Sequence, residues 1–155
     1  MRHAVHPATL DDVSGIQALV NAMAFSAEGG DLLPRSRESI EGNLGYFSVI
    51  RDEGRVIGCV ALARIGNDLA EIRSLAMHAD YRGLGLGAAL VDHTLEQAKD
   101  RGYERVFALT RRPGFFEKLG FKVGLLSQFP QKVWLDCQPC PRRAMCDETA
   151  VVIAV

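Results

Sequence analysis

The chain has 155 residues, which is enough for one domain with a buried core. Hydrophobic residues make up 48% and charged residues 24%, and the formal net charge is −1. Such a composition is typical of a globular protein, and the near-neutral charge gives no support for binding nucleic acid over the whole surface. There is no apolar run of the roughly 20 residues that a membrane-spanning helix needs, and the N-terminus lacks a signal-peptide pattern. We therefore expect one cytoplasmic domain over residues 1–155, with neither a membrane nor a nucleic acid as partner.

The first half of the chain alternates between strand and helix patterns. A strand is expected at residues 4–8, and Thr9 then has the side chain of a helix cap, followed by acidic residues. Apolar residues continue at helical spacing up to Met23, and Ser36 is placed to cap a second helix over residues 37–44. Two strand patterns, at 46–51 and 55–65, are separated by Asp52-Glu53-Gly54, which is typical of a hairpin turn.

The second half continues this alternation. The expected elements are a strand at 70–77, a helix from about residue 85 to 101, a strand at 105–110, a short helix at 113–119, and strands at 121–124 and 149–155. Gly102 stands where a glycine commonly ends a helix. This order predicts an α/β (α+β) fold, in which a central mixed, mostly antiparallel sheet is flanked by helices on both faces.

The segment between the strand at 70–77 and the following helix holds the most informative motif. It reads Arg82-Gly83-Leu84-Gly85-Leu86-Gly87. Glycines let a backbone approach a ligand closely and adopt positive φ. The first turn of a helix adds unpaired N–H groups and the positive end of the helix dipole. Together with the fixed charge of Arg82, these features predict a binding site for a pyrophosphate.

Two interpretations of this loop compete. Gly83-x-Gly85-x-x-Ala88 also fits the dinucleotide-binding fingerprint, but that motif begins directly after its strand and needs an acidic residue for the ribose. Here residues 78–82 intervene, and no acidic residue ends the next strand. Arg82-x-x-Gly85-x-Gly87 instead resembles the acetyl-coenzyme A loop of the GNAT family of N-acetyltransferases, and the downstream FFEKLGF at 115–121 resembles the closing helix and turn of that family.

Further segments resemble the acetyltransferase domain of N-acetylglutamate synthases. They are Leu33-Pro34-Arg35-Ser36-Arg37-Glu38, Ala70-Glu71-Ile72 and Leu109-Thr110-Arg111-Arg112, and the cysteine-containing tail from Lys132 to Glu148 is similar to the short, single-domain form. The resemblance implies a GNAT fold, acetyl-CoA as cosubstrate, and L-glutamate as the acceptor in the first step of arginine biosynthesis. No segment corresponds to the kinase-like domain of the long form, so regulation by arginine is left open.

The reaction needs a base for the attacking amine and hydrogen-bond donors for the thioester. Glu71 resembles the strand glutamate that serves as the base in several GNAT enzymes, and a carboxylate there can take the proton directly or through water. The alternatives are an exposed strand residue or an ion-pair partner of Arg73. The resemblance also implies that a backbone N–H polarises the thioester oxygen, and it places these residues along the coenzyme: Leu75, Ala76, Met77, Arg82, Gly83, Leu84, Gly85, Leu86, Gly87 and Phe116.

Many GNAT enzymes carry a tyrosine in the closing helix that reprotonates the thiolate, and this chain has Phe116 there instead. A thiolate whose conjugate acid has a pKa near ~8.5 can leave unprotonated or take a proton from water. Tyr46, Tyr81 and Tyr103 are alternative donors. Phe116 is more simply interpreted as a core residue and one wall of the coenzyme slot.

The two carboxylates of glutamate require positive, preferably bidentate donors. The candidates stand beside strand ends or in the motif segments: Arg35, Arg73, Arg111, Arg112 and Lys132. Some of them are expected to be solvated surface charges, and Arg35, Arg73 and Arg112 are the first choices. The expected partner is thus a small-molecule substrate, an amino acid with L-glutamate as the first choice, and a homodimer is left open.

The cysteines give a weaker signal. Cys137-x-x-Cys140 with Cys146 suits a metal knuckle or a redox pair, but a structural zinc site needs a fourth ligand. Small buried thiols are the simplest interpretation, also for Cys59, which lies in an apolar strand pattern. The four histidines lack the spacing of a catalytic metal site, so no metal is expected.

Two other functions compete with glutamate acetylation. One is an acetyltransferase for a different amine, such as a polyamine or a protein N-terminus. A polyamine site would require an acidic lining, which the arginine candidates oppose. The other is a non-catalytic acyl-CoA sensor, which the missing closing-helix tyrosine favours and a base at Glu71 opposes.

Overall fold

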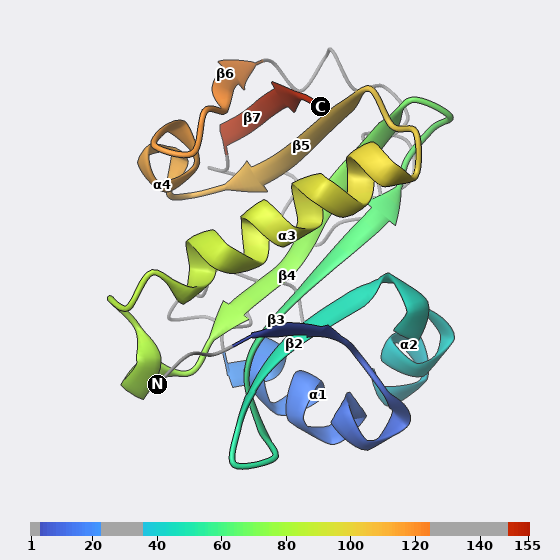
Figure 1. The fold of residues 1–155 in the computed structure, drawn as a ribbon, viewed down its shortest axis with the longest axis vertical. Coiled ribbons are helices and arrows are strands. Elements are labelled where there is room, and N and C mark those ends of the chain that lie inside the picture. The colour runs from blue at the N-terminus through green and yellow to red at the C-terminus, as the bar shows by residue number, and fades with distance from the viewer. Residues whose placement is uncertain (1–3, 23–35, 125–148) are drawn as a thin grey trace, which may run out of the picture. The chain divides into compact units, whose positions relative to one another are not determined.

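A computed structural model of the chain describes residues 4–22, 36–124 and 149–155. Most predicted ends agree with the structure to within two residues, and Met23 lies outside the described residues. In chain order the elements are β1 (Val5–Pro7), the 3-10 turn η1 (Leu10–Asp12), α1 (Val13–Ala22), α2 (Arg37–Gly42), η2 (Leu44–Tyr46), β2 (Phe47–Asp52), β3 (Arg55–Arg64), β4 (Leu69–Met77), η3 (Ala79–Tyr81), α3 (Leu86–Asp100), β5 (Arg105–Thr110), α4 (Pro113–Glu117), β6 (Lys122–Gly124) and β7 (Thr149–Ala154) (Figure 1).

The strands pair as one mixed sheet. Within the described residues it has seven strands in the order β1-β2-β3-β4-β5-β7-β6. β1 with β2, β2 with β3, β5 with β7 and β6 with β7 are antiparallel, whereas β4 is parallel to β5. The predicted mixed, mostly antiparallel sheet flanked by helices is therefore confirmed.

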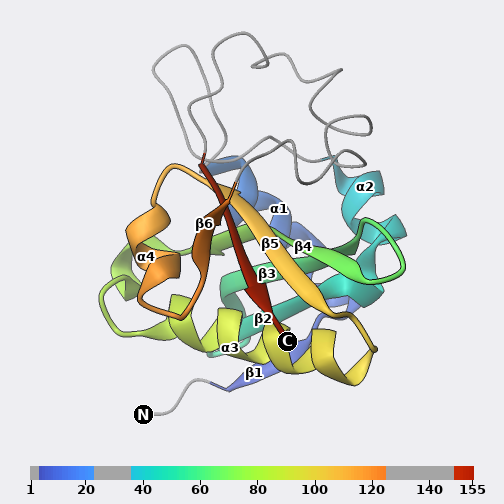
Figure 2. The same cartoon turned by 90° about the horizontal axis from the view of Figure 1, so that it is seen from above.

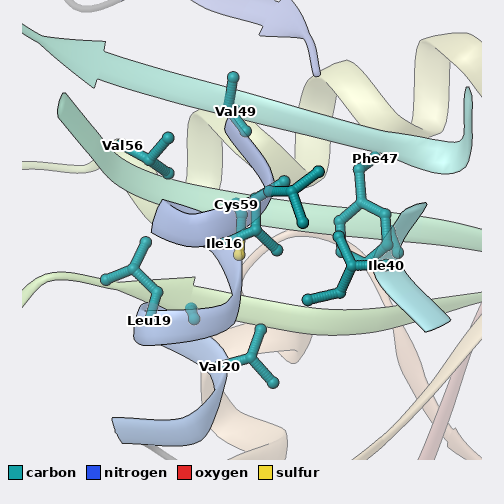
Figure 3. Close-up of a cluster of buried hydrophobic side chains, with 11 residues drawn as sticks. Ile16, Leu19, Val20, Ile40, Phe47, Val49, Val56 and Cys59 are labelled. Atoms are coloured by element: carbon teal, nitrogen blue, oxygen red, sulfur yellow. The ribbon is translucent and has the colours of Figure 1, made fainter. Parts of the chain in front are cut away.

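The chain divides into two compact units, each with its own core. Among the described residues, the first unit comprises those up to Ala63 together with Ile72–Gln97. Its core lies where α1 and α2 cover β2 and β3, and Figure 3 shows the α1 side chains among those of the strands. The main members are Ile16, Leu19, Val20, Ile40, Phe47, Val49, Val56 and Cys59. The cysteine predicted as a core residue, Cys59, is fully buried here.

Two glycines let the helices of this unit lie close to β3. A Cβ on Gly15 of α1 would stand 2.8 Å from the Val56 Cβ, and a Cβ on Gly58 of β3 would stand 2.5 Å from the Met77 sulfur and 3.2 Å from Leu90 Cδ1 of α3. In a close-packed interior such approaches force neighbouring groups to move. These glycines therefore provide space, and nothing in the surrounding sequence marks them.

A partly buried ion pair joins η1, at the start of α1, to β2. Asp12 is 3% exposed, and its carboxylate accepts two bonds from the Arg51 guanidinium, Nε to Oδ1 at 2.8 Å and Nη2 to Oδ2 at 2.5 Å. The bond from Arg51 lowers the pKa of Asp12 below its usual value. Oδ2 also accepts the Thr9 N–H at 2.8 Å, so the cap predicted at Thr9 depends on the Asp12 side chain.

The second unit comprises Arg64–Glu71 and the described residues from Ala98 onward. In it β7 lies between β5 and β6, antiparallel to both (Figure 2). The start of β4, Leu69–Glu71, pairs in parallel with Arg105–Phe107 of β5. A small core of Ile65, Leu69, Phe107 and Ala150 fills this region.

The end of α3 also belongs to the second unit and follows the sequence prediction. Gly102 has φ +84°, a left-handed conformation that glycine adopts without a Cβ penalty. Its N–H bonds to the Lys99 carbonyl at 3.1 Å, and the Tyr103 N–H bonds to the Ala98 carbonyl at 3.0 Å. These bonds satisfy carbonyls that the helix end would otherwise leave unpaired.

Candidate active site

The proposed base, Glu71, lies at a buried position of β4. It is 3% exposed and stands opposite Phe107 in the parallel ladder with β5. The alternative of an exposed strand residue is therefore wrong. A buried carboxylate needs hydrogen-bonding or charged partners, because leaving it unpaired in the interior is costly. Burial on a strand also restricts the side chain to a narrow range of positions, as a proton acceptor requires.

Three residues after Glu71, β4 contains an unusual backbone conformation. Ser74 has φ +54° although it is not a glycine, and it is 7% exposed. A left-handed conformation costs an ordinary residue about 1–2 kcal/mol, and such residues cluster at functional sites. The Cys59 thiol of β3 donates a hydrogen bond to the Ser74 carbonyl at 3.4 Å, which stabilises the conformation. The sequence carries no signal for this feature.

Leu75–Met77 directly follow the Ser74 conformation. Their burial alternates, since Ala76 is 1% exposed and both neighbours are half-buried. The main chain here is the segment predicted to hydrogen-bond the pantetheine arm, and it follows directly after the left-handed Ser74. The next N–H, of His78, donates to the Ile57 carbonyl of β3 at 2.7 Å and so fixes the point where β4 ends.

The glycine loop has the conformation that its sequence predicts. Gly83 and Gly85 have φ of +81° and +77°, and a Cβ on either would meet none of the described atoms within 4 Å. The loop thus needs these glycines for their backbone and not to relieve a clash within the protein. Helix α3 begins at Leu86, and its first bond runs from the Ala89 N–H to the Gly85 carbonyl at 3.1 Å. The N–H groups of residues 86–88 precede that bond, as those of an anion-binding helix start do.

Arg82 supplies the charge at this loop. It is exposed, and its guanidinium makes no hydrogen bond or ion pair with the described residues. An exposed cation beside free helix N–H groups is the combination that phosphate oxygens favour. The segment from Arg82 to Gly87, predicted to contact the coenzyme, is therefore exposed or half-buried throughout, and its glycines at 83 and 85 have the positive φ expected of such a loop.

A tyrosine side chain forms a hydrogen bond between the loop and a strand that is distant in sequence. The Tyr81 hydroxyl donates to Oδ2 of Asp52, the last residue of β2. This bond raises the pKa of Tyr81, so the hydroxyl is a weaker acid than an ordinary phenol. Tyr81 is therefore poorly suited to reprotonating a thiolate. Of the other tyrosines weighed for that role, Tyr46 is 42% exposed in η2, and Tyr103 follows the end of α3.

The predicted acceptor-binding residues fall in different parts of the structure. Arg111 is half-buried and Arg112 exposed where β5 ends and α4 begins, and the Arg112 N–H donates to Thr110 Oγ1 at 2.8 Å. Arg73 is half-buried on β4, two residues after Glu71. Arg35 and Lys132 lie outside the described residues.

Phe116, at the position of the missing tyrosine, is a core residue of α4. It is 5% exposed, and its ring packs edge-on against Phe115 and Phe121 with centroid distances of 5.1 Å in both cases. The sequence-based interpretation of Phe116 as core is confirmed, and its contact with the coenzyme stays a prediction.

Within the described ranges, no group of three or more His, Cys, Asp and Glu side chains is placed to hold a metal ion. Cys137, Cys140 and Cys146 lie outside these ranges. In the same part of the chain, none of the helices has the length and apolar character needed to cross a membrane.

Comparison with known proteins identifies the class. The acetyltransferase (GNAT) family profile matches residues 16–121, which include β4, the glycine loop, α3 and α4. The chain belongs to the GNAT family of acetyltransferases. It has the GNAT fold and is an N-acetyltransferase that uses acetyl-CoA as cosubstrate.

Two relatives show what the chain is similar to in sequence. The chain is 40% identical to an uncharacterized N-acetyltransferase of Chlorobaculum tepidum, over 96% of this chain and 94% of the relative. It is 39% identical to an amino-acid acetyltransferase of Shewanella oneidensis, over 81% of this chain and 28% of that protein. The chain thus spans little more than a quarter of the amino-acid acetyltransferase that it matches.

Solved structures show the same likeness. A Mycobacterium tuberculosis protein, Rv2747, in complex with CoA and NLQ, superposes with a TM-score of 0.85 at 25% identity, covering 98% of this chain and 99% of that one. N-acetylglutamate synthase from Neisseria gonorrhoeae, complexed with coenzyme A and N-acetyl-glutamate, superposes with a TM-score of 0.84 at 27% identity, covering 99% of this chain and 35% of that one.

Proposed function

We propose that this chain transfers the acetyl group of acetyl-CoA to the α-amine of L-glutamate, the first step of arginine biosynthesis. The observation that carries the proposal is its 39% identity to an amino-acid acetyltransferase over 81% of the chain. The likeness to an N-acetylglutamate synthase that was solved with N-acetyl-glutamate supports it.

The coenzyme is proposed to lie along the end of β4 and the glycine loop. Its pyrophosphate would meet Arg82 and the first N–H groups of α3, while the main chain of Leu75–Met77 would pair with the pantetheine arm. Positive φ at Gly83 and Gly85 and the exposure of Arg82 support this placement. An N–H group of Leu75–Met77 would then donate to the thioester oxygen, which gains negative charge as the amine attacks.

Glu71 is the proposed base. The ammonium group of the substrate must lose a proton before its nitrogen can attack the thioester carbon. Glu71 accepts that proton, directly or through water. After the attack, the nitrogen loses its second proton to solvent, and the tetrahedral intermediate collapses to form the amide and release the CoA thiolate. Burial of Glu71 supports this role, because it fixes the carboxylate on β4. No phenol stands at Phe116, so the thiolate takes its proton from water or leaves as the anion.

Arginine side chains are proposed to hold the two carboxylates of glutamate. Arg73, two residues after Glu71 on β4, and Arg112, at the start of α4, are the candidates within the described residues. Arg35, Arg111 and Lys132 complete the proposed set. A guanidinium binds a carboxylate through two parallel bonds, which also orients the amino acid with its amine toward the base.

Thiol release from acetyl-CoA, measured with a panel of amines, tests the acceptor. We expect kcat/KM to be highest for L-glutamate, lower for glutamine and aspartate, and negligible for spermidine and for peptides with a free N-terminus. A cationic amine or a peptide as the best acceptor would contradict the glutamate assignment and leave the acetyltransferase class intact. Coenzyme binding without turnover of any amine would indicate a sensor.

A further inference from the structure

Tyr81 directly precedes Arg82 of the glycine loop, and its side chain hydrogen-bonds a residue far from it in sequence. Its hydroxyl donates to Asp52 Oδ2 at the end of β2. Its N–H bonds to the His78 carbonyl at 3.0 Å, and the two rings meet edge-on with centroids 5.8 Å apart. The η3 turn is thus held at its start by the main chain and at its end by the Tyr81 side chain.

Beyond Tyr81 the loop has few restraints of its own. The exposed Arg82 guanidinium has no partner among the described residues, and the sites of a Cβ on Gly83 and Gly85 are open. Leu84 is 62% exposed. The Arg82 N–H bonds to the Ala79 carbonyl of the η3 turn at 3.4 Å, and the next backbone bond of this segment among the described residues runs from the Ala89 N–H to the Gly85 carbonyl at 3.1 Å. The position of Arg82 therefore depends on how Tyr81 is held.

We propose that Tyr81 and Asp52 are positioning residues for coenzyme binding, because their hydrogen bond fixes the start of the loop so that Arg82 and the first N–H groups of α3 meet the pyrophosphate. The inference rests on the proposed placement of the pyrophosphate at this loop. A loop that must be ordered when the ligand arrives loses affinity through lost conformational freedom, and a loop that is already fixed does not.

The charge of Asp52 argues against a direct contact with the coenzyme. A carboxylate beside a pyrophosphate repels it, so Asp52 is not a ligand. The hydroxyl that donates to this carboxylate keeps the loop and the β2–β3 hairpin together. The carboxylate in turn raises the pKa of Tyr81, so the phenol keeps its proton and remains a donor through the physiological pH range.

Calorimetric titration with coenzyme A tests the pair in the full chain. The variants are Tyr81→Phe, Asp52→Ala, Asp52→Asn and the double variant Tyr81→Phe/Asp52→Ala. Glu53→Gln is the matched control, because it removes a charge from the same hairpin and affects the same tyrosine only through space. Circular dichroism and the thermal midpoint of each variant establish that it is folded.

We expect Tyr81→Phe and Asp52→Ala each to weaken coenzyme A binding about ten-fold, and the double variant to be no weaker than either alone. Asp52→Asn keeps an acceptor oxygen, so its affinity for coenzyme A should lie between those of Asp52→Ala and the wild type. Glu53→Gln should bind as the wild type does. With S-acetylpantetheine, a donor without a pyrophosphate, kcat/KM of all these variants should stay within about two-fold of the wild type.

Several results would overturn the proposal. Additive losses in the double variant would show that the two residues do not act together. An equal loss with S-acetylpantetheine would assign them a merely structural role. Wild-type affinity in Tyr81→Phe and Asp52→Ala, alongside a loss in Gly85→Val, would reject the pair and keep the loop as the pyrophosphate site. Unchanged affinity in a folded Gly85→Val variant would reject the placement of the pyrophosphate itself.

Discussion

The start of β4 and the loop after its end differ in how exposed their candidate functional groups are. At the start, Glu71 is 3% exposed and paired into the ladder with β5, so its use depends on a buried side chain. After the end, Gly83 and Gly85 have positive φ, a Cβ on either would meet none of the described atoms within 4 Å, and the groups proposed to bind the pyrophosphate are backbone N–H groups. Burial restrains a proton acceptor, whereas exposure lets a phosphate approach. Substitutions at the two places should therefore affect different steps of the reaction.

The largest effect is expected from Gly85→Val. A β-branched residue cannot adopt φ +77° without strain, and its side chain blocks the approach of phosphate oxygens. Coenzyme A affinity, measured by calorimetry, should fall about 10²-fold or more, because several charge-assisted bonds are lost. Gly102→Val is the matched control, since Gly102 has φ +84° and open surroundings at the end of α3. It should lower stability similarly and leave coenzyme affinity unchanged.

Glu71→Gln tests the buried carboxylate at the start of β4. The amide keeps the shape of the side chain but cannot accept the proton of the amine, so kcat should fall by about 10². Coenzyme A affinity should stay at the wild-type value. Glu117→Gln, at an exposed position of α4, serves as the control and should not change kcat. An unchanged rate in Glu71→Gln across the pH range of the assay would demote Glu71 to a structural role.

Arg73→Ala and Arg112→Ala are expected to raise the KM for glutamate about 30-fold each, which corresponds to about 2 kcal/mol for a carboxylate that loses its charged partner. The KM for acetyl-CoA should hardly change. Arg64→Ala provides the comparison, because Arg64 is exposed and its guanidinium bonds the Asn67 side chain at 2.5 Å. Normal glutamate kinetics in both variants would remove these arginines from the acceptor site.

Gly15→Ala should affect stability alone. The new Cβ would stand 2.8 Å from the Val56 Cβ, and overpacking of this kind costs about 1–3 kcal/mol. The better helix propensity of alanine offsets about 1 kcal/mol of that. Urea unfolding should show a net loss of about 1 kcal/mol, with unchanged affinity for coenzyme A. A more stable variant would mean that α1 can move away from β3 at little cost.

The smallest effect at neutral pH concerns the Asp12–Arg51 pair. Its bond to Arg51 lowers the pKa of Asp12 in the folded state, so the carboxylate contributes stability above its unfolded pKa and loses that contribution as the pH falls through the folded pKa. The unfolding free energy should therefore be flat near neutrality and decline below about pH 4. The stability difference between wild type and Asp12→Asn, from urea titrations, should shrink over that acidic range. A constant difference would contradict this account.

Local signals in the sequence were enough for most of the elements and for the loop. Thr9, Ser36 and Gly102 mark helix ends, and alternating or helical spacing of apolar residues marks the strands and helices. The glycine loop was recognisable because its requirement is local: φ is positive within a few residues of a helix start and an arginine. Glu71 was recognisable by resemblance, but its burial was not, since a charged residue in a strand is by default exposed.

By itself, then, the sequence determined the order of elements, the fold class and the positive-φ glycines of the loop, because each follows from residues that are neighbours in the chain. Only the tertiary structure decided which groups meet across long separations. Gly15 and Gly58 are needed because Val56, Met77 and Leu90 come close to them. Tertiary packing also produces three hydrogen bonds between distant residues: from Arg51 to Asp12, from Tyr81 to Asp52, and from Cys59 to the left-handed Ser74. Such contacts depend on strand register and helix packing, which bring together side chains whose spacing along the chain carries no period.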